Sequence, residues 1–315
     1  MQTHIRIGTR KSSLAMWQAE YIANQLRCHS PSCTVELIPI LTKGDRLLHE
    51  PLARIGGKGL FIKELENAMI DGRIDAAVHS LKDVPALLPP ELVITAITTR
   101  ADCHDAFVSN RYASLDDLPS GAIVGTSSLR RQAQLLHYRP DLAIHTLRGN
   151  VNTRLHKLDN NEYDAIILAQ AGLLRLGLSA RITQTLPDSI MLPACGQGAL
   201  AVECRKEDYA LRQLLSCVNN EDMTTIATAE RSFSACIGGS CQVPAGACGI
   251  LDGDTLTVTA LIASPDGRRL YRRSLSGSRT EAAILGNTLG NALLTDGGAA
   301  ILQEMGISPS PKETI

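Results

Sequence analysis

The stretch Ile74-Asp75-Ala76-Ala77-Val78-His79-Ser80-Leu81-Lys82-Asp83-Val84-Pro85 indicates the architecture of the whole chain. Its first five residues are mainly apolar, which is typical of a short buried strand. Lys82 and Asp83 follow the carboxyl end of this strand, where open α/β sheets place their ligands. Taken alone, such a pair is more often solvated in a turn, which Pro85 would end here. The rest of the chain decides between these two interpretations.

Strands and helices alternate around this stretch. Strands are predicted over residues 4–8, 35–41 and 74–78, and helices over residues 14–26 and 60–70. Ser12 or Ser13 is a natural N-cap for the first of these helices. The alternation predicts a parallel sheet with helices on both faces.

The same pattern restarts at about Arg100. Strands are predicted over residues 123–125, 143–147 and 164–168, and helices over residues 129–137 and 151–158. Gly8-Thr9-Arg10-Lys11-Ser12-Ser13-Leu14 and Gly125-Thr126-Ser127-Ser128-Leu129 share one arrangement, in which a strand, Gly-Thr, two serines and a helix follow each other. This similarity predicts that one architectural solution is used twice.

The last third of the chain has a different pattern. After a glycine-rich connector at 193–198, a strand over 200–203 is expected to return to the first sheet, and residues 219–222 mark a boundary. Further elements are predicted as helices over 223–235 and 280–305 and as strands over 255–262 and 269–275, with a hairpin turn at 264–267. We therefore predict three domains, formed by residues 1–99 with 200–218, by 100–199, and by 219–315.

Composition excludes several classes of protein. A net charge of -1 and an aromatic content of 3% argue against binding of nucleic acid. A strand-like run begins almost at Met1, so no secretory signal is expected. No membrane span is expected either, because no apolar run approaches the required length. Nine cysteines without an export signal favour a reduced cytosol over a disulfide framework. Their spacing does not match a structural zinc site, so no metal is expected.

Several arginines stand at predicted strand ends or in first helical turns, close to the two serine-rich turns. A helix N-terminus offers free N–H groups to an anion, and a guanidinium holds a carboxylate or phosphate by two hydrogen bonds. Each arginine alone is more often a solvated surface residue. Together they predict a small ligand that carries several carboxylates or phosphates. The arginines are Arg10, Arg130, Arg131, Arg148 and Arg154.

The loop Gly56-Gly57-Lys58-Gly59 resembles a phosphate-binding loop only loosely, because it lacks the full spacing and the Ser/Thr after lysine. A mobile loop over residues 42–59, which brings Arg54 and Lys58 over a cleft, fits the glycine content better.

A second unusual loop is Ile237-Gly238-Gly239-Ser240-Cys241-Gln242-Val243-Pro244. Two glycines before the cysteine and Val-Pro after it predict an exposed, conformationally demanding loop. The alternative is that Cys241 is a small core residue, as expected for Cys236 and Cys248.

Taken together, these motifs resemble the porphobilinogen deaminase (hydroxymethylbilane synthase) family over nearly the whole chain. The resemblance rests on six motifs in order: 8–12, 56–61, 79–85, 125–131, 147–154 and 239–244. It implies two similar periplasmic-binding-protein-like α/β domains plus a small C-terminal α+β domain with an antiparallel three-stranded sheet. It also implies a cytoplasmic, monomeric transferase of tetrapyrrole (haem) biosynthesis, with hand-over of its product to uroporphyrinogen III synthase as a further implication.

The resemblance implies roles for individual residues. Cys241 matches the cysteine that holds a dipyrromethane cofactor, a retained primer, through a thioether, and Asp83 matches the catalytic carboxylate. The implied cofactor contacts are Lys82, Asp83, Thr126, Ser128, Arg130, Arg131, Arg148 and Gly149. The implied substrate contacts are Arg10, Ser12, Arg54, Lys58, Arg148, Arg154, Arg175 and Gln197. Two positions depart from the family pattern: Ser240 replaces a glycine, and Arg54 stands where lysine is frequent.

The implied reaction gives these residues a physical role. Four porphobilinogen molecules are joined head to tail with loss of ammonia, and hydrolysis frees hydroxymethylbilane. Loss of ammonia leaves an electron-poor pyrrole cation, which a carboxylate such as Asp83 stabilises. Each pyrrole brings an acetate and a propionate, which accounts for many arginines in a chain of almost no net charge.

Two alternatives stay open on the residues alone. Two α/β domains with an anion site also describe solute-binding proteins and regulatory effector domains, although the chain shows neither an export signal nor a helix-turn-helix segment. An acyl or phosphoryl transferase with Cys241 as nucleophile would need a histidine base, and none lies beside it in the sequence; His79 would reach it only through the fold.

Overall fold

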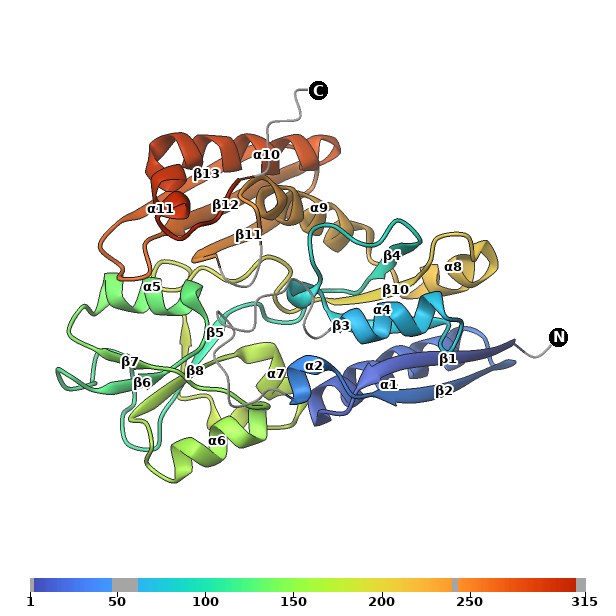
Figure 1. Cartoon of the computed structure of the whole chain (residues 1–315), viewed down its shortest axis with the longest axis horizontal. Coiled ribbons are helices and arrows are strands. Elements are labelled where there is room, and N and C mark those ends of the chain that lie inside the picture. The colour runs from blue at the N-terminus through green and yellow to red at the C-terminus, as the bar shows by residue number, and fades with distance from the viewer. Residues whose placement is uncertain (1–2, 47–61, 240–242, 310–315) are drawn as a thin grey trace. The chain divides into compact units, whose positions relative to one another are not determined.

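The computed structural model describes residues 3–46, 62–239 and 243–309 (Figure 1). The chain divides into two compact units, residues 1–101 with 198–224 and residues 102–197 with 225–315. The second unit holds both a five-stranded and a three-stranded sheet. Our division into three domains stays a prediction.

The first unit is built on a five-stranded sheet of order β2-β1-β3-β10-β4. Its strands are β1 (Thr3–Arg10), β2 (Cys33–Ile40), β3 (Ala76–Ser80), β4 (Leu92–Ile97) and β10 (Leu200–Arg205). The return of residues 200–203 to this sheet is confirmed. The prediction of a parallel sheet is wrong for the part of the sheet that contains β10, because β10 pairs antiparallel with both β3 and β4.

Helices cover both faces of the first sheet, as predicted. α1 (Ser13–His29) and α8 (Tyr209–Leu215) pack on one face through residues such as Ile22 and Leu215. α4 (Lys63–Ile70) packs on the other through Leu65 and Met69. A short helix, α2 (Lys43–Arg46), follows β2.

The second unit repeats this plan in a sheet of order β7-β6-β8-β5-β9. Its strands are β5 (Asp105–Val108), β6 (Ile123–Gly125), β7 (Ala143–His145), β8 (Ala165–Ala169) and β9 (Gln184–Leu186). β7, β6 and β8 are parallel, and β5 runs antiparallel to β8 and β9. The predicted repetition of one architecture is therefore confirmed at the level of strand order and direction.

Three helices follow the parallel strands of this second sheet. They are α5 (Leu129–Tyr138), α6 (Val151–Asp159) and α7 (Gln170–Arg175). Leu135 of α5 packs on one face of the sheet, whereas Leu155 of α6 and Leu173 of α7 pack on the other. A helix thus follows closely after each of these parallel strands, and α7 begins directly after β8.

The C-terminal part forms an antiparallel sheet of order β11-β12-β13. It comprises β11 (Ala245–Asp252), β12 (Thr255–Ala263) and β13 (Leu270–Ser278), packed against α9 (Glu221–Cys236) and α10 (Ala282–Leu293). The α/β plus α+β fold class is confirmed.

The continuous helix predicted over 280–305 is wrong. The chain ends α10 at Leu293, and α11 (Ala299–Glu304) starts beyond a break at Gly297, whose φ is 132°. A Cβ there would lie 2.5 Å from Cζ of Tyr271, so glycine permits both the left-handed backbone and the close packing. None of the described helices is long and apolar enough to cross a membrane.

Candidate functional site

The turn between β1 and α1 is built by local rules. Gly8 lies inside β1, two residues before its end, and packs closely, since a Cβ there would lie 2.3 Å from Cδ1 of Ile74. The buried Thr9 hydroxyl donates to the Ala15 carbonyl at 2.9 Å. Ser12, one of the two expected N-caps, accepts a hydrogen bond from Ala15 N at 3.3 Å. The turn therefore holds the first helix N-terminus at the carboxyl end of β1.

Arg10 in this turn is paired with Asp45, a residue that the sequence analysis did not single out. Its Nε donates to the Asp45 carboxylate at 3.3 Å, and Nη2 makes a second, shorter contact. Burial alone would raise the pKa of Asp45, but hydrogen bonds and charge from Arg10, with help from Thr42, lower it. Arg10 and Asp45 thus form a half-buried, bidentate ion pair.

Lys82 and Asp83 lie directly after β3, as predicted. Residues Leu81–Asp83 form one short 3₁₀ turn, which the fully buried Leu81 anchors. Leu81 N donates to the Ala199 carbonyl at 3.0 Å, and Val84 N donates back to Leu81 at 3.1 Å. Lys82 and Asp83 stay partly exposed on this turn. Their side chains are therefore accessible at a strand end whose backbone is fixed.

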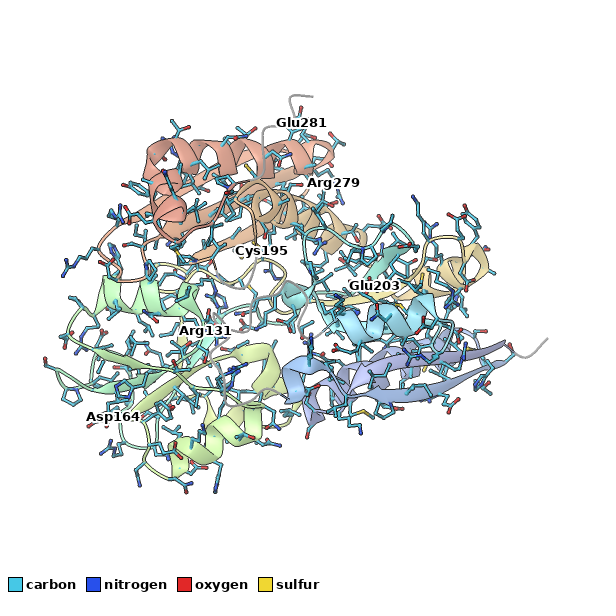
Figure 2. The ribbon with its side chains drawn as sticks, in the orientation of Figure 1. Arg131, Asp164, Cys195, Glu203, Arg279 and Glu281 are labelled. Carbon is cyan, nitrogen blue, oxygen red and sulfur yellow. The ribbon has the colours of Figure 1, made fainter. Side chains whose placement is uncertain are left out.

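A buried ionisable cluster lies close to this turn. His79 Nε2 is 2.9 Å from Oε2 of Glu203 on β10 (Figure 2), and both side chains are almost completely buried. The other Glu203 oxygen has no hydrogen-bonding partner in the described part of the chain. Burial, and then the charge of Glu203, raise the pKa of nearby Glu66.

The turn between β6 and α5 has the same local construction as the first. A Cβ on Gly125 would lie 2.7 Å from the Tyr163 ring. Thr126 is buried, and its hydroxyl accepts a hydrogen bond from Ser128 N at 3.1 Å. Ser128 caps α5 by accepting a hydrogen bond from Arg131 N at 3.5 Å. Both serine turns thus present a capped helix N-terminus, as the sequence predicts.

Arg130 and Arg131, expected to hold ligand, are both bound to Asp105 inside the second unit. Arg131 lies at the start of α5 (Figure 2), and the exposed fractions of Arg130 and Arg131 are 4% and 6%. Each donates to Asp105 at 2.7 Å. Asp105 is the main residue of this region that sequence reasoning missed. The signal was weak: an acid at the start of the apolar run of β5.

The turn after β7 holds a partly buried cation, Arg148. Gly149 has a φ of 117°, and a Cβ there would lie 2.7 Å from Cγ2 of Thr153. This places Arg148 before the N-terminus of α6, where its Nη1 is buried without a hydrogen-bonding partner among the described residues. Burial lowers the pKa of Arg148. An anion that accepts a hydrogen bond from Nη1 would reverse this cost.

The other predicted residues have varied positions. Arg154 Nε donates to the Gly149 carbonyl at 2.8 Å, and half-buried Arg175 ends α7. Gln197 is buried, and its amide donates to the Cys103 carbonyl at 2.7 Å and to Asp105 at 2.9 Å.

Three predicted residues, Arg54, Lys58 and Cys241, lie outside the described residues. The convergence of the first unit's residues and the second unit's residues on one cleft stays a prediction. Within each unit, the described ones gather at the carboxyl ends of parallel strands, where α/β sheets bind ligands.

The sequence matches two domains of one protein family. Residues 5–213 match "Porphobilinogen deaminase, dipyromethane cofactor binding domain", and residues 224–295 match "Porphobilinogen deaminase, C-terminal domain". Together the matches span almost the whole of both described units.

Solved structures of low sequence identity are also similar. The methionine-binding protein MetQ is 15% identical, with a TM-score of 0.44 over 72% of this chain and 94% of its own. A nutrient-binding protein from Burkholderia cenocepacia, bound to methionine, is 15% identical, with a TM-score of 0.43 over 69% of this chain and 92% of its own. A periplasmic substrate-binding protein of an ABC transporter from Coxiella burnetii is 16% identical, with a TM-score of 0.43 over 72% and 96%.

Proposed function

The chain belongs to the porphobilinogen deaminase family, and we propose that Asp83 is its catalytic carboxylate and that Cys241 holds its cofactor. It is a hydroxymethylbilane synthase of tetrapyrrole biosynthesis, with porphobilinogen as substrate and a dipyrromethane cofactor.

The residues of the second unit fit a cofactor that carries carboxylates. Arg148 Nη1 is a buried donor without a partner among the described residues, and burial lowers the pKa of this guanidinium. A carboxylate at this atom would supply both the missing acceptor and the missing charge. This orphaned donor is the observation that carries the proposed anion site. When bound, the dipyrromethane supplies the pyrrole to which substrate is joined.

Further residues are proposed to contact the cofactor or the substrate. The proposed cofactor contacts are Lys82, Asp83, Thr126, Ser128, Arg130, Arg131, Arg148 and Gly149, with covalent attachment through Cys241. The proposed substrate contacts are Arg10, Ser12, Arg54, Lys58, Arg148, Arg154 and Arg175, whereas Gln197 is buried and donates to Cys103 and Asp105. The helix N-termini after Ser12 and Ser128 add backbone N–H groups and a favourable dipole to these contacts.

Asp83 has the position that the reaction requires of a carboxylate. It is partly exposed on a turn whose backbone is fixed by buried Leu81. Departure of ammonia from porphobilinogen leaves a cation with an acidic pyrrole N–H, and a fixed carboxylate stabilises this charge without reorganisation. Asp83 accepts a hydrogen bond from that N–H and thereby lowers the barrier to loss of ammonia.

We place the enzyme in the cytoplasm as a monomer that binds neither nucleic acid nor membrane. The net charge of -1 and the low aromatic content support the absence of a nucleic-acid partner. Transfer of product to uroporphyrinogen III synthase completes the proposal. The loop predicted over residues 42–59 begins with the short helix α2, and its part beyond Arg46 lies outside the described residues.

The role of Asp83 is tested by Asp83→Asn. Removal of one preorganised electrostatic group costs about 10²–10³ in kcat, and more where a full charge is lost. We expect porphobilinogen consumption and ammonia release to fall by at least that factor while the protein stays folded. Asp71→Asn, which alters an exposed carboxylate of the same unit, is the control and should be unaffected. Near-normal turnover by Asp83→Asn would remove Asp83 from catalysis.

The role of Cys241 is tested by intact mass spectrometry. The native protein should be heavier than its sequence by one covalent dipyrrole, and Cys241→Ala should have the mass of its sequence. Cys28→Ala, at an exposed cysteine, should keep the adduct. An active native protein without any adduct would overturn the assignment.

A further inference from the structure

Asp105 organises a buried polar cluster at the start of β5. Its Oδ2 accepts from Arg130 Nη1 at 2.7 Å, and its Oδ1 accepts from Arg131 Nη2 at 2.7 Å and Nε at 3.1 Å. Gln197 Nε2 adds a bond of 2.9 Å to the same oxygen. The exposed fraction of Asp105 is 0%. One carboxylate therefore fixes three side chains, two from α5 and one from the connector before β10.

The two arginines also donate hydrogen bonds to backbone carbonyls of neighbouring segments. Arg130 Nη1 also donates to the Leu192 carbonyl at 2.7 Å, and Arg131 Nη1 donates to the Ile167 carbonyl of β8 at 2.9 Å. The backbone N–H of Arg131 also donates the hydrogen bond that the capping Ser128 hydroxyl accepts. Arg131 thus contacts the serine turn through its backbone N–H, and contacts β5 and β8 through its side chain. These contacts of Arg131 hold the Ser128 turn against β5 and β8.

The cluster has an uncompensated charge. Among the described residues, Arg130 and Arg131 both form ion pairs with Asp105, so these three groups together carry one formal positive charge. Burial lowers the pKa of Arg130 although Asp105 opposes the shift. Burial would also raise the pKa of Asp105, but Arg130 and Arg131 together hold it far below the usual range. A buried net charge is costly unless a ligand of opposite charge is nearby.

We propose that Asp105, assisted by Gln197, is a positioning residue that aims the Arg130 and Arg131 pair and the Ser128 turn at one carboxylate of the cofactor. Asp105 itself does not touch the ligand. It neutralises one of the two guanidinium groups and fixes both, and the remaining positive charge selects an anion. The proposal also gives Gln197 a supporting part, in place of direct substrate contact. It rests on the proposed function.

The test is the loading of apoprotein with porphobilinogen. Protein made in cells that cannot synthesise porphobilinogen is incubated with it, and the mass-shifted fraction of folded protein is followed by intact mass spectrometry. In Asp105→Asn, we expect the half-saturating porphobilinogen concentration for loading to rise at least tenfold, because charge-assisted hydrogen bonds no longer orient the arginines. Gln197→Met keeps every charge and should show a smaller rise in the same direction.

Asp164→Asn is the matched control. Asp164 precedes β8, at the opposite end of the same sheet from the serine turn, and is also paired with an arginine, Arg111 (Figure 2). Its loss should lower stability without a change in half-saturation. Native-like half-saturation in both Asp105→Asn and Gln197→Met would overturn the positioning role. Failure of Asp105→Asn to fold leaves Gln197→Met to decide. A native chain that never gains the dipyrrole would instead overturn the proposed function.

Discussion

The two serine turns of the molecule have the same backbone plan but different electrostatic surroundings. Gly8 and Gly125 each lack room for a Cβ, Thr9 and Thr126 are buried, and each turn ends in a serine that caps the next helix. Each turn also has an arginine–aspartate pair nearby. The likeness therefore extends from the strand end to the first helical turn.

The arginine–aspartate pairs differ in burial. Arg10 and Asp45 have exposed side-chain fractions of 26% and 18%, whereas Arg131 and Asp105 have 7% and 0%. Short-range motifs determine the turn, but residues distant in sequence determine its charge environment. The difference predicts a preformed anion site in the second unit and a more adjustable one at Arg10.

The largest expected effect compares the two aspartates. Asp105→Asn leaves two guanidinium groups without a buried counter-charge, which costs about 3–5 kcal/mol. Asp45→Asn breaks a partly solvated pair and should cost about 1 kcal/mol. Chemical denaturation followed by circular dichroism measures both. Equal losses would show that burial does not distinguish the two turns.

A second prediction concerns the two closely packed glycines, Gly8 and Gly125. Gly125→Ala pushes a methyl group against the rigid Tyr163 ring, and overpacking of this kind costs about 1–3 kcal/mol. Gly8→Ala meets the terminal methyl of Ile74 instead. Ile74→Val removes that methyl, so it should partly restore the stability of Gly8→Ala, as measured by the thermal midpoint. No recovery in the double variant would contradict the packing described for Gly8.

The serine caps are expected to be nearly equivalent. Ser12→Ala and Ser128→Ala should each lower stability by about 1 kcal/mol, because each removes the acceptor for a helix N-terminal N–H. Ser13→Ala, at the first helical residue, is the control and should have little effect. A much larger loss at one cap would show that the turns are not alike in construction.

The smallest effect is one of pH. The pKa values of Asp45 and Asp105 are both lowered in the folded protein, so each stabilises the fold above about pH 3.8 and loses that contribution as pH falls through its folded-state pKa. The Asp105 contribution is lost over a wider range, because its pKa is lowered further. Between pH 4 and 2, the stability gap between the native protein and Asp105→Asn should keep shrinking after the gap to Asp45→Asn has become constant. The reverse order would contradict the assigned burial.

Local patterns predicted local structure well. The strands, the helices that follow them and the cap at Ser12 rest on contacts between near neighbours, and the structure confirms them. The break at Gly297 was missed, because only packing against Tyr271 distinguishes it from a helical glycine. The antiparallel direction of β10 was missed for the same reason, since register with distant strands decides it.

Candidate site residues were predicted by type and place, but their partners were not. Arg130 and Arg131 are separated from Asp105 by about 25 residues of sequence, and nothing local to either arginine indicates that carboxylate. Asp45 and Arg10 are likewise distant in sequence. Ion pairs of this kind depend on the fold, which brings the partners together after the local elements have formed.

The central claim is that the enzyme elongates on a primer that it keeps. The most direct measurement is incubation of the loaded native protein with isotopically labelled porphobilinogen, with ammonia, hydroxymethylbilane and intact protein mass followed together. We predict four ammonia molecules for each linear tetrapyrrole, label in every ring of the product, and an unlabelled dipyrrole still on the protein after many turnovers. Unlabelled rings in the product with loss of the original adduct, or no ammonia release at all, would contradict the account.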